Sequence, residues 1–123
     1  MGKKVKIKWL GEPQEHDYPA AQSFLSLVFE PPAARQLVEE LQRAGMSEFA
    51  AKDVFRASGL SLLGVSNSHV QKDRESIIQN EKLSPLLLVR DRNTGKVVIA
   101  DGYHRLCAVY TFYEDAMIPC KIV

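Results

Sequence analysis

The stretch KVVIADGYHRLCAVYTFY, residues 96–113, joins a short apolar run to a longer one through an Asp-Gly turn. The run KVVIA has the length and β-branched composition of a buried strand. From Leu106 to Tyr113 every residue except Thr111 is apolar or aromatic, so we expect a helix that is packed on most of its circumference. His104 and Arg105 therefore stand out, because they place two polar side chains in the first turn of a buried helix.

A strand that runs directly into a helix leaves the amides of the first helical turn free near the end of a sheet. Such a turn is suited to bind an anion. Asp101 is the expected N-cap of this helix, and Gly102 would let a ligand or another backbone segment come close. This junction is the first candidate site.

Arg105 must find a partner, because an unpaired buried charge is very costly. One interpretation is structural: Arg105 pairs with Glu114 or Asp91, and His104 caps a loop carbonyl. The other is functional: Arg105 and His104 bind a phosphate group. The residues alone leave both open.

The segments before the turn favour a helix and a hairpin. NSHVQKDRESIIQN, residues 67–80, carries Val70, Ile77 and Ile78 on one helical face, and the following EKLSP breaks the helix. LLLVRD and KVVIA are apolar runs joined by RNTG, which predicts a hairpin, and a last strand is expected over 117–123.

The first half is less informative. Residues 4–10 alternate between lysines and Val5, Ile7 and Trp9, which predicts a half-buried strand. Its lysines either protect a sheet edge or contact phosphate. Helices are expected over 17–29, with Asp17 as a cap, and over 33–44, and a third helix from Ser47. This half would be a lid or a dimer surface, so a homodimer is one expectation.

Two helices joined by AGMS, residues 44–47, resemble a helix-turn-helix, in which the second helix reads DNA. That helix carries Glu48 and Asp53 against Lys52 and Arg56, so its charge adds almost nothing to DNA affinity. A plain helical hairpin is the favoured interpretation.

The composition excludes a global polyanion-binding surface. The 123 residues contain 16 Lys and Arg against 15 Asp and Glu, so DNA remains a possible partner that net charge does not support. No apolar run is long enough for a signal peptide or a membrane span, which predicts a cytoplasmic protein without a membrane partner. Cys107 and Cys120 lack metal-ligand spacing and are expected as reduced core residues, although a disulfide between them is the alternative.

VIADGYHRLCA, residues 98–108, resembles the DGHHRLxA box of ParB-like domains, and DGYHRLCAVY…IPCKIV is similar to the corresponding part of sulfiredoxin. The resemblance covers residues 60–123. It implies a single α+β domain with a ParB/sulfiredoxin-like small mixed sheet packed with helices, to which residues 1–59 add a strand and a helical hairpin. It also implies that a nucleotide such as ATP or CTP binds through its phosphates, with Mg²⁺, and that the terminal phosphate is hydrolysed or transferred. The alternatives are a non-catalytic anion- or partner-binding module and a DNA-binding or nuclease protein.

Carried over residue by residue, the phosphate-binding positions match Gly102, His104 and Arg105, and Asp101 matches the ParB-like variant. Tyr103 lies within the same box and is counted with these binding residues. It stands where sulfiredoxin has its nucleophilic cysteine, so sulfinic acid reduction is not expected.

The helix before the LSP loop borders the nucleotide in the relatives, which adds His69, Lys72 and Arg74 as candidate phosphate contacts. A solvated charged face is the alternative for Lys72 and Arg74. A phosphoryl transferase also needs carboxylates, and the candidates that the sequence does not rank are Asp73, Glu75, Glu81 and Asp101. No metal site built by the protein is expected.

Overall fold

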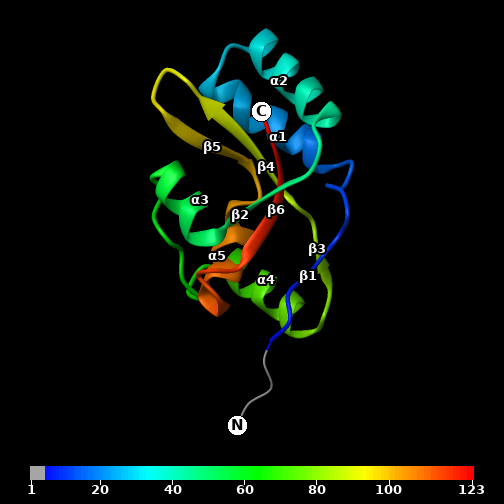
Figure 1. Ribbon diagram of the computed structural model, residues 1–123, viewed down its shortest axis with the longest axis vertical. Helices are drawn as coiled ribbons and strands as arrows, with labels where there is room; N and C mark the ends of the chain where they lie inside the picture. The colour runs from blue at the N-terminus through cyan, green and yellow to red at the C-terminus, as the bar shows by residue number, and fades with distance from the viewer. Residues whose placement is uncertain (1–4) are drawn as a thin grey trace.

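The computed structural model describes residues 5–123 and contains helices on both faces of a small sheet (Figure 1). Its elements, in chain order, are β1 (Lys8–Trp9), α1 (Asp17–Val28), α2 (Pro31–Arg43), β2 (Ser47–Ala50), α3 (Ala51–Ser58), α4 (Ser68–Ile78), β3 (Lys82–Leu83), β4 (Leu86–Asp91), β5 (Lys96–Asp101), α5 (Tyr103–Phe112) and β6 (Met117–Ile122).

The larger sheet has the order β2-β6-β4-β5. β4 and β5 form the expected antiparallel hairpin, β6 lies parallel to β4, and β2 pairs antiparallel with β6. β1 and β3 form a separate parallel pair. The fold is therefore α+β with a mixed sheet, as the sequence predicts.

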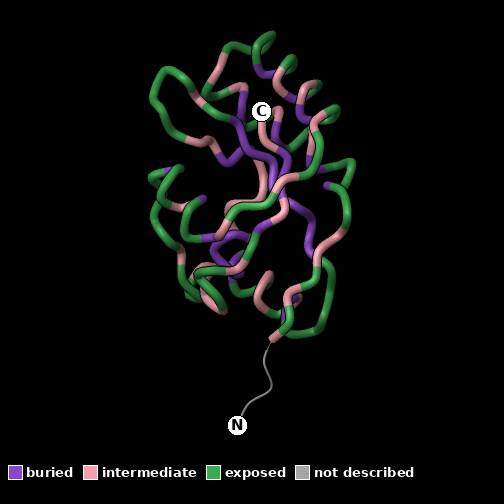
Figure 2. The backbone as a smooth tube through the Cα atoms, viewed as in Figure 1, coloured by how far each residue is buried: buried purple, intermediate pink, exposed green. Residues whose placement is uncertain are grey.

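The position of strand β4 between two helical layers explains why its sequence is continuously apolar. Leu87 and Val89 belong to the cluster formed with α1 and α2, whereas Leu86 and Leu88 belong to the cluster formed with α3, α4 and α5. All four are buried, and Figure 2 shows β4 within the buried centre of the molecule. Because both faces are covered, alternate positions need no polar residue.

The alternation at the N-terminus is confirmed, but the strand is shorter than expected. Val5, Ile7 and Trp9 are half-buried against the core, while Lys6 and Lys8 are exposed. Only residues 8–9 form β1, and the predicted strand's first residue, Lys4, lies outside the described residues.

The third helix does not begin at Ser47, so the favoured helical hairpin across residues 44–47 is wrong, and so is the helix-turn-helix alternative. Residues 47–50 form β2, whose residues pair with β6 from Ser47 opposite Cys120 to Ala50 opposite Met117. α3 follows only at Ala51. The pairing with β6 decides this structure, because a four-residue segment has little preference of its own.

Residues of both halves share one core. β2 from the first half extends the sheet built by residues 86–122, and α1 packs on β5. Asp17 is the first residue of α1 rather than its cap, and its buried carboxylate accepts hydrogen bonds from the Gln14 amide at 3.1 Å and from the Ser84 hydroxyl. Over residues 5–123, none of the helices is both long and apolar enough to cross a membrane.

Candidate functional site

A cavity of about 250 Å³ lies where β5 passes into α5. It is bordered by α4 on one side and by the first turn of α5 on the other. Its lining residues are His69, Lys72, Asp73, Asp101, Gly102, Tyr103, His104 and Arg105. All the candidate binding residues named from the sequence except Arg74 thus meet at one place, together with Asp73.

Gly102, rather than Asp101, is the N-cap of α5. Its φ of 106° lies in the region that favours glycine. A Cβ at this position would lie 2.7 Å from Leu86 Cγ and 3.0 Å from Arg105 Nη2. The glycine is therefore needed because the side chains of Leu86 and Arg105 come close to it. The sequence had led us to expect a ligand or a backbone segment at this place.

The first turn of α5 has unused amides. The first helical hydrogen bond runs from the Leu106 amide to the Gly102 carbonyl, at 2.9 Å. The amides of Tyr103, His104 and Arg105 make no hydrogen bond to residues 5–123, and no side chain caps the helix. These three donors and the positive end of the helix dipole favour a negative ligand.

Arg105 pairs with Asp101, the carboxylate that the sequence predicts as the helix cap. Its Nη2 lies 2.9 Å from Asp101 Oδ2 and donates to the Pro85 carbonyl at 3.4 Å, so Arg105 does pair with a carboxylate, but with Asp101 instead of the expected Glu114 or Asp91. One turn of helix separates Asp101 from Arg105, which makes them neighbours. Arg105 Nε is buried without a partner, and Nη1 makes no hydrogen bond to the described residues. The protein thus engages one of the three guanidinium nitrogens.

α4 supplies the opposite wall of the cavity. The Asn67 side chain caps this helix by accepting hydrogen bonds from the amides of His69 and Val70 at 2.9 and 3.2 Å. His69 faces His104 of α5, with 4.8 Å between the ring centroids, and Lys72 lies one turn further along. Lys72 is exposed, so its ammonium group can reach a ligand at the cavity mouth.

Arg74, the third candidate on α4, does not line the cavity. Its guanidinium lies 4.1 Å from the centroid of the Phe112 ring and donates to the Thr111 hydroxyl. Arg74 therefore joins α4 to the last turn of α5, and its role is structural.

Two of the four candidate carboxylates line the cavity. Burial raises the pKa of Asp73, and the nearby positive charge of Arg105 only partly offsets this. Burial also raises the pKa of Asp101, again against Arg105. Glu75 and Glu81 are exposed and do not line the cavity. Asp73 was named from the sequence but not ranked, although residues 69, 72 and 73 have the spacing of one helical face.

Neither Tyr103 nor Cys107 is an activated nucleophile. Burial raises the pKa of the Tyr103 phenol, whose hydroxyl donates to the Ser61 carbonyl. Burial also raises the pKa of Cys107, one turn later on the same helix. Cys107 and Cys120 are both buried and free, so the predicted reduced state is confirmed. Thiolate chemistry at this turn is disfavoured.

No group of three or more His, Cys, Asp or Glu side chains within residues 5–123 is arranged to hold a metal ion. Mg²⁺ is often held by one or two carboxylates together with the phosphates of a substrate. Any Mg²⁺ at this cavity would therefore depend on ligand phosphates for most of its coordination.

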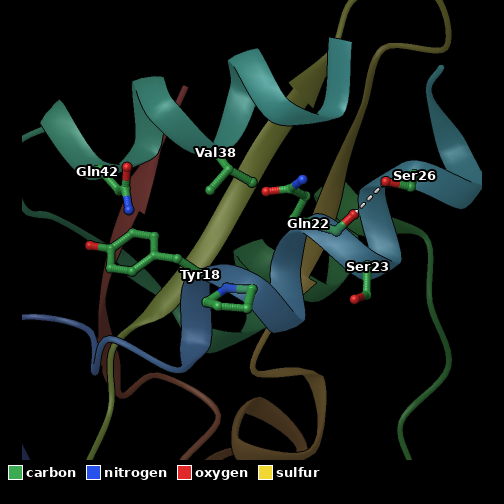
Figure 3. A pocket seen from close by; sticks show the side chains of 7 residues that line it. Tyr18, Gln22, Ser23, Ser26, Val38 and Gln42 are labelled. Carbon is green, nitrogen blue, oxygen red and sulfur yellow. Dashed lines mark hydrogen bonds between the residues drawn. The ribbon is translucent and has the colours of Figure 1, made fainter. Parts of the chain in front are cut away.

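A second cavity, of about 390 Å³, lies between α1 and α2 (Figure 3). Tyr18 and Gln42 lie at one end of it and Ser23 and Ser26 at the other, and the Ser26 hydroxyl donates to the Gln22 carbonyl at 2.8 Å. All of its lining side chains are uncharged. It therefore lacks the chemistry of an anion site, although it is larger than the cavity at α5.

The cavity at α5 is thus the candidate site, because it combines free amides, two cationic side chains, two histidines and two carboxylates. Neither a protein-family model nor a curated protein nor a solved structure matches this chain.

Proposed function

We propose that the protein binds the phosphate group of a nucleotide at the N-terminus of α5. The observation that carries the proposal is the convergence of Lys72, His69 and the first turn of α5 around one cavity. Arg105 Nε, which is buried without a hydrogen-bond partner, adds to it. Three free amides and two cationic side chains are suited to the oxygens of a phosphate.

The size of the cavity indicates which part of the ligand it takes. Pockets for drug-sized ligands have volumes of about 300–1,000 Å³. A cavity of about 250 Å³ is too small for a whole nucleotide. The phosphate would enter the cavity, and the nucleoside would extend over the neighbouring surface.

The energetics require such additional contacts. A helix dipole contributes about 0.3–1 kcal/mol, and each hydrogen bond to a charged group about 1.5–3 kcal/mol. Arg105 and Lys72 together with the dipole therefore supply about 3–7 kcal/mol, whereas a micromolar ligand needs about 8 kcal/mol. The nucleoside would supply the remainder.

The sequence supports a nucleotide over other phosphorylated ligands. The DGYHRLCA box, residues 101–108, resembles the phosphate-binding box of ParB-like domains. Mg²⁺ enters this proposal as an ion carried by the triphosphate. DNA binding through a helix-turn-helix is not favoured, because strand β2 takes the place of the start of its recognition helix.

A thermal-shift panel tests the proposal. ATP, ADP, CTP, GTP and inorganic phosphate would each be added, with and without Mg²⁺, to the wild type, Arg105→Ala, Lys72→Ala and Arg92→Ala. Arg92 is the matched control, because it is an exposed cation in the β4–β5 turn, at the other end of the hairpin from Asp101.

A nucleotide at one hundred times its dissociation constant adds about 2.7 kcal/mol, or on the order of 10 °C in Tm for this chain length. We expect Arg105→Ala to abolish the ligand-induced shift, Lys72→Ala to reduce it and Arg92→Ala to leave it unchanged. The ligand-induced change is compared, because Arg105→Ala alters the Tm itself by leaving Asp101 unpaired. The proposal is wrong if no ligand shifts the wild type, or if Arg105→Ala shifts as far as the wild type does.

A further inference from the structure

Asp73 is a carboxylate in the candidate cavity that the binding of a phosphate does not explain. Asp101 is held by Arg105 at 2.9 Å. Asp73, in contrast, makes no ion pair or side-chain hydrogen bond within residues 5–123. It nevertheless lines the cavity beside the groups that would hold the phosphate. A negative side chain at that place would repel a phosphate, so phosphate binding alone gives Asp73 no role.

The surroundings of Asp73 set its charge state. The titratable and charged groups that share the cavity with it are His69 and Lys72 from α4, Asp101 from β5, and Tyr103, His104 and Arg105 from α5. Arg105, His104, His69 and Lys72 favour its ionised form, but burial outweighs them and raises the pKa of Asp73. A carboxyl group with a raised pKa is a stronger proton acceptor once it is ionised.

We propose that Asp73 is the general base of a phosphoanhydride hydrolysis at this site, in which it activates a water molecule beside the terminal phosphate of a bound nucleoside triphosphate. The proposal rests on the proposed function, because it needs the phosphate in the cavity at α5. The geometry that supports it is the position of an unpaired carboxylate in the cavity that holds the phosphate-binding groups.

In the reaction, an Asp73 carboxylate oxygen takes a proton from the water molecule while the water oxygen forms a bond to phosphorus. The bond between phosphorus and the leaving oxygen breaks, and that oxygen leaves with the electron pair. For a nucleoside triphosphate the products are the diphosphate and inorganic phosphate, and the proton on Asp73 returns to solvent. Arg105 and Lys72 stabilise the charge on the phosphoryl oxygens in the transition state.

The test measures phosphate release from each nucleoside triphosphate that produces a thermal shift, with Mg²⁺, by the wild type, Asp73→Asn and Glu75→Gln. Glu75 is the matched control, because it is an exposed carboxylate on the same helix outside the cavity. We expect Asp73→Asn to lower kcat by about 10²–10⁴-fold. The nucleotide-induced thermal shift should remain, since asparagine removes a negative charge and keeps the size. Glu75→Gln should retain wild-type kcat.

A pH profile distinguishes a base from a positioning residue. The wild-type kcat should fall on the acid side as Asp73 becomes protonated, and the residual activity of Asp73→Asn should lack that limb.

Three results would overturn the proposal. A wild type that binds nucleotides but releases no phosphate has no such activity, and the proposed function then stands without this extension. Equal kcat in Asp73→Asn and the wild type would assign the base elsewhere, for instance to His69 or His104. Recovery of Asp73→Asn by excess Mg²⁺ would make Asp73 a metal ligand. If no nucleotide binds at all, the proposed function itself has failed.

Discussion

Replacing Gly102 by alanine tests the packing that positions the candidate site. Gly102 has a φ of 106°, and its added Cβ would lie 2.7 Å from Leu86 Cγ. Leu86 is fully buried, so its side chain has little room to move away. The Cβ would also lie 3.0 Å from Arg105 Nη2, so the guanidinium would have to shift. The substitution should therefore weaken both the fold and the binding of phosphate.

The magnitude has two parts. A left-handed backbone costs a non-glycine residue about 1–2 kcal/mol, and overpacking costs a further 1–3 kcal/mol or so. For 123 residues, 1 kcal/mol corresponds to about 4 °C in Tm. We therefore expect Gly102→Ala to lower the free energy of unfolding by about 2–5 kcal/mol, measured by denaturant unfolding. The corresponding fall in Tm, measured by calorimetry, is on the order of 8–20 °C.

Gly95→Ala is the matched control for the steric part. Gly95 has a φ of 73°, but nothing lies within 4 Å of its added Cβ. It should lose only the backbone part, about 1–2 kcal/mol. If the two variants lost the same stability, the close contact with Leu86 would carry no cost and the account of the Gly102 turn would be refuted.

Three further perturbations have defined outcomes. Lys121→Ala should lose about 1.5–3 kcal/mol in denaturant unfolding, because the buried Nζ donates to the Gln42 carbonyl at 3.0 Å, whereas Lys82→Ala, which removes an exposed lysine, should be nearly neutral. Ellman's reagent at pH 8 should leave both cysteines unmodified until denaturant is added, since both are buried and burial raises the pKa of Cys120 to about 11; rapid labelling of the native protein would contradict this. Asp73→Asn should raise the free energy of unfolding at pH 7 by less than about 1 kcal/mol, and this gain should vanish near pH 4. Burial raises the pKa of Asp73 in the native protein, so the wild type loses stability as the pH rises from the unfolded to the native pKa of this carboxyl group. A lower free energy of unfolding for Asp73→Asn at pH 7 would refute this reasoning.

The elements with strong local signals were predictable from sequence. Residues 86–91 and 96–101 are apolar runs on either side of a turn, and they form the hairpin. The buried helix α5 follows from its nearly continuous apolar sequence, and α4 from its apolar face and Asn67 cap. In each case, the segment's own pattern agrees with the packing that surrounds it.

The exceptions depend on partners far away in the chain. β2 at residues 47–50 forms because β6 offers it an edge, and β3 at residues 82–83 forms because β1 does, yet neither segment has a strand pattern of its own. The prediction that Asp101 caps the helix was wrong for a related reason. Its carboxylate extends along the first turn to Arg105 instead of capping the helix, because Gly102 takes the cap position.

The candidate site was predictable in membership but not in arrangement. Spacing and resemblance chose His69, Lys72, Arg74 and residues 101–105, and all of them except Arg74 line one cavity. The ion pair of Arg105, the packing of His69 on His104 and the isolation of Asp73 result from the way α4 meets α5. No sequence pattern predicts how these two helices pack against each other.

Amide NMR during a titration with inorganic phosphate tests the central claim most directly. If phosphate binds at the N-terminus of α5, the amide resonances of Tyr103, His104 and Arg105 should shift together and saturate. The amides of Ala51 and Lys52 at the start of α3 are the internal control, because they already donate to the carbonyls of Ala116 and Glu114 at 2.9 and 3.0 Å. Shifts at α5 that saturate while α3 stays still are the predicted result. Unchanged resonances at α5, or equal shifts at both helices, would contradict a phosphate site at this turn.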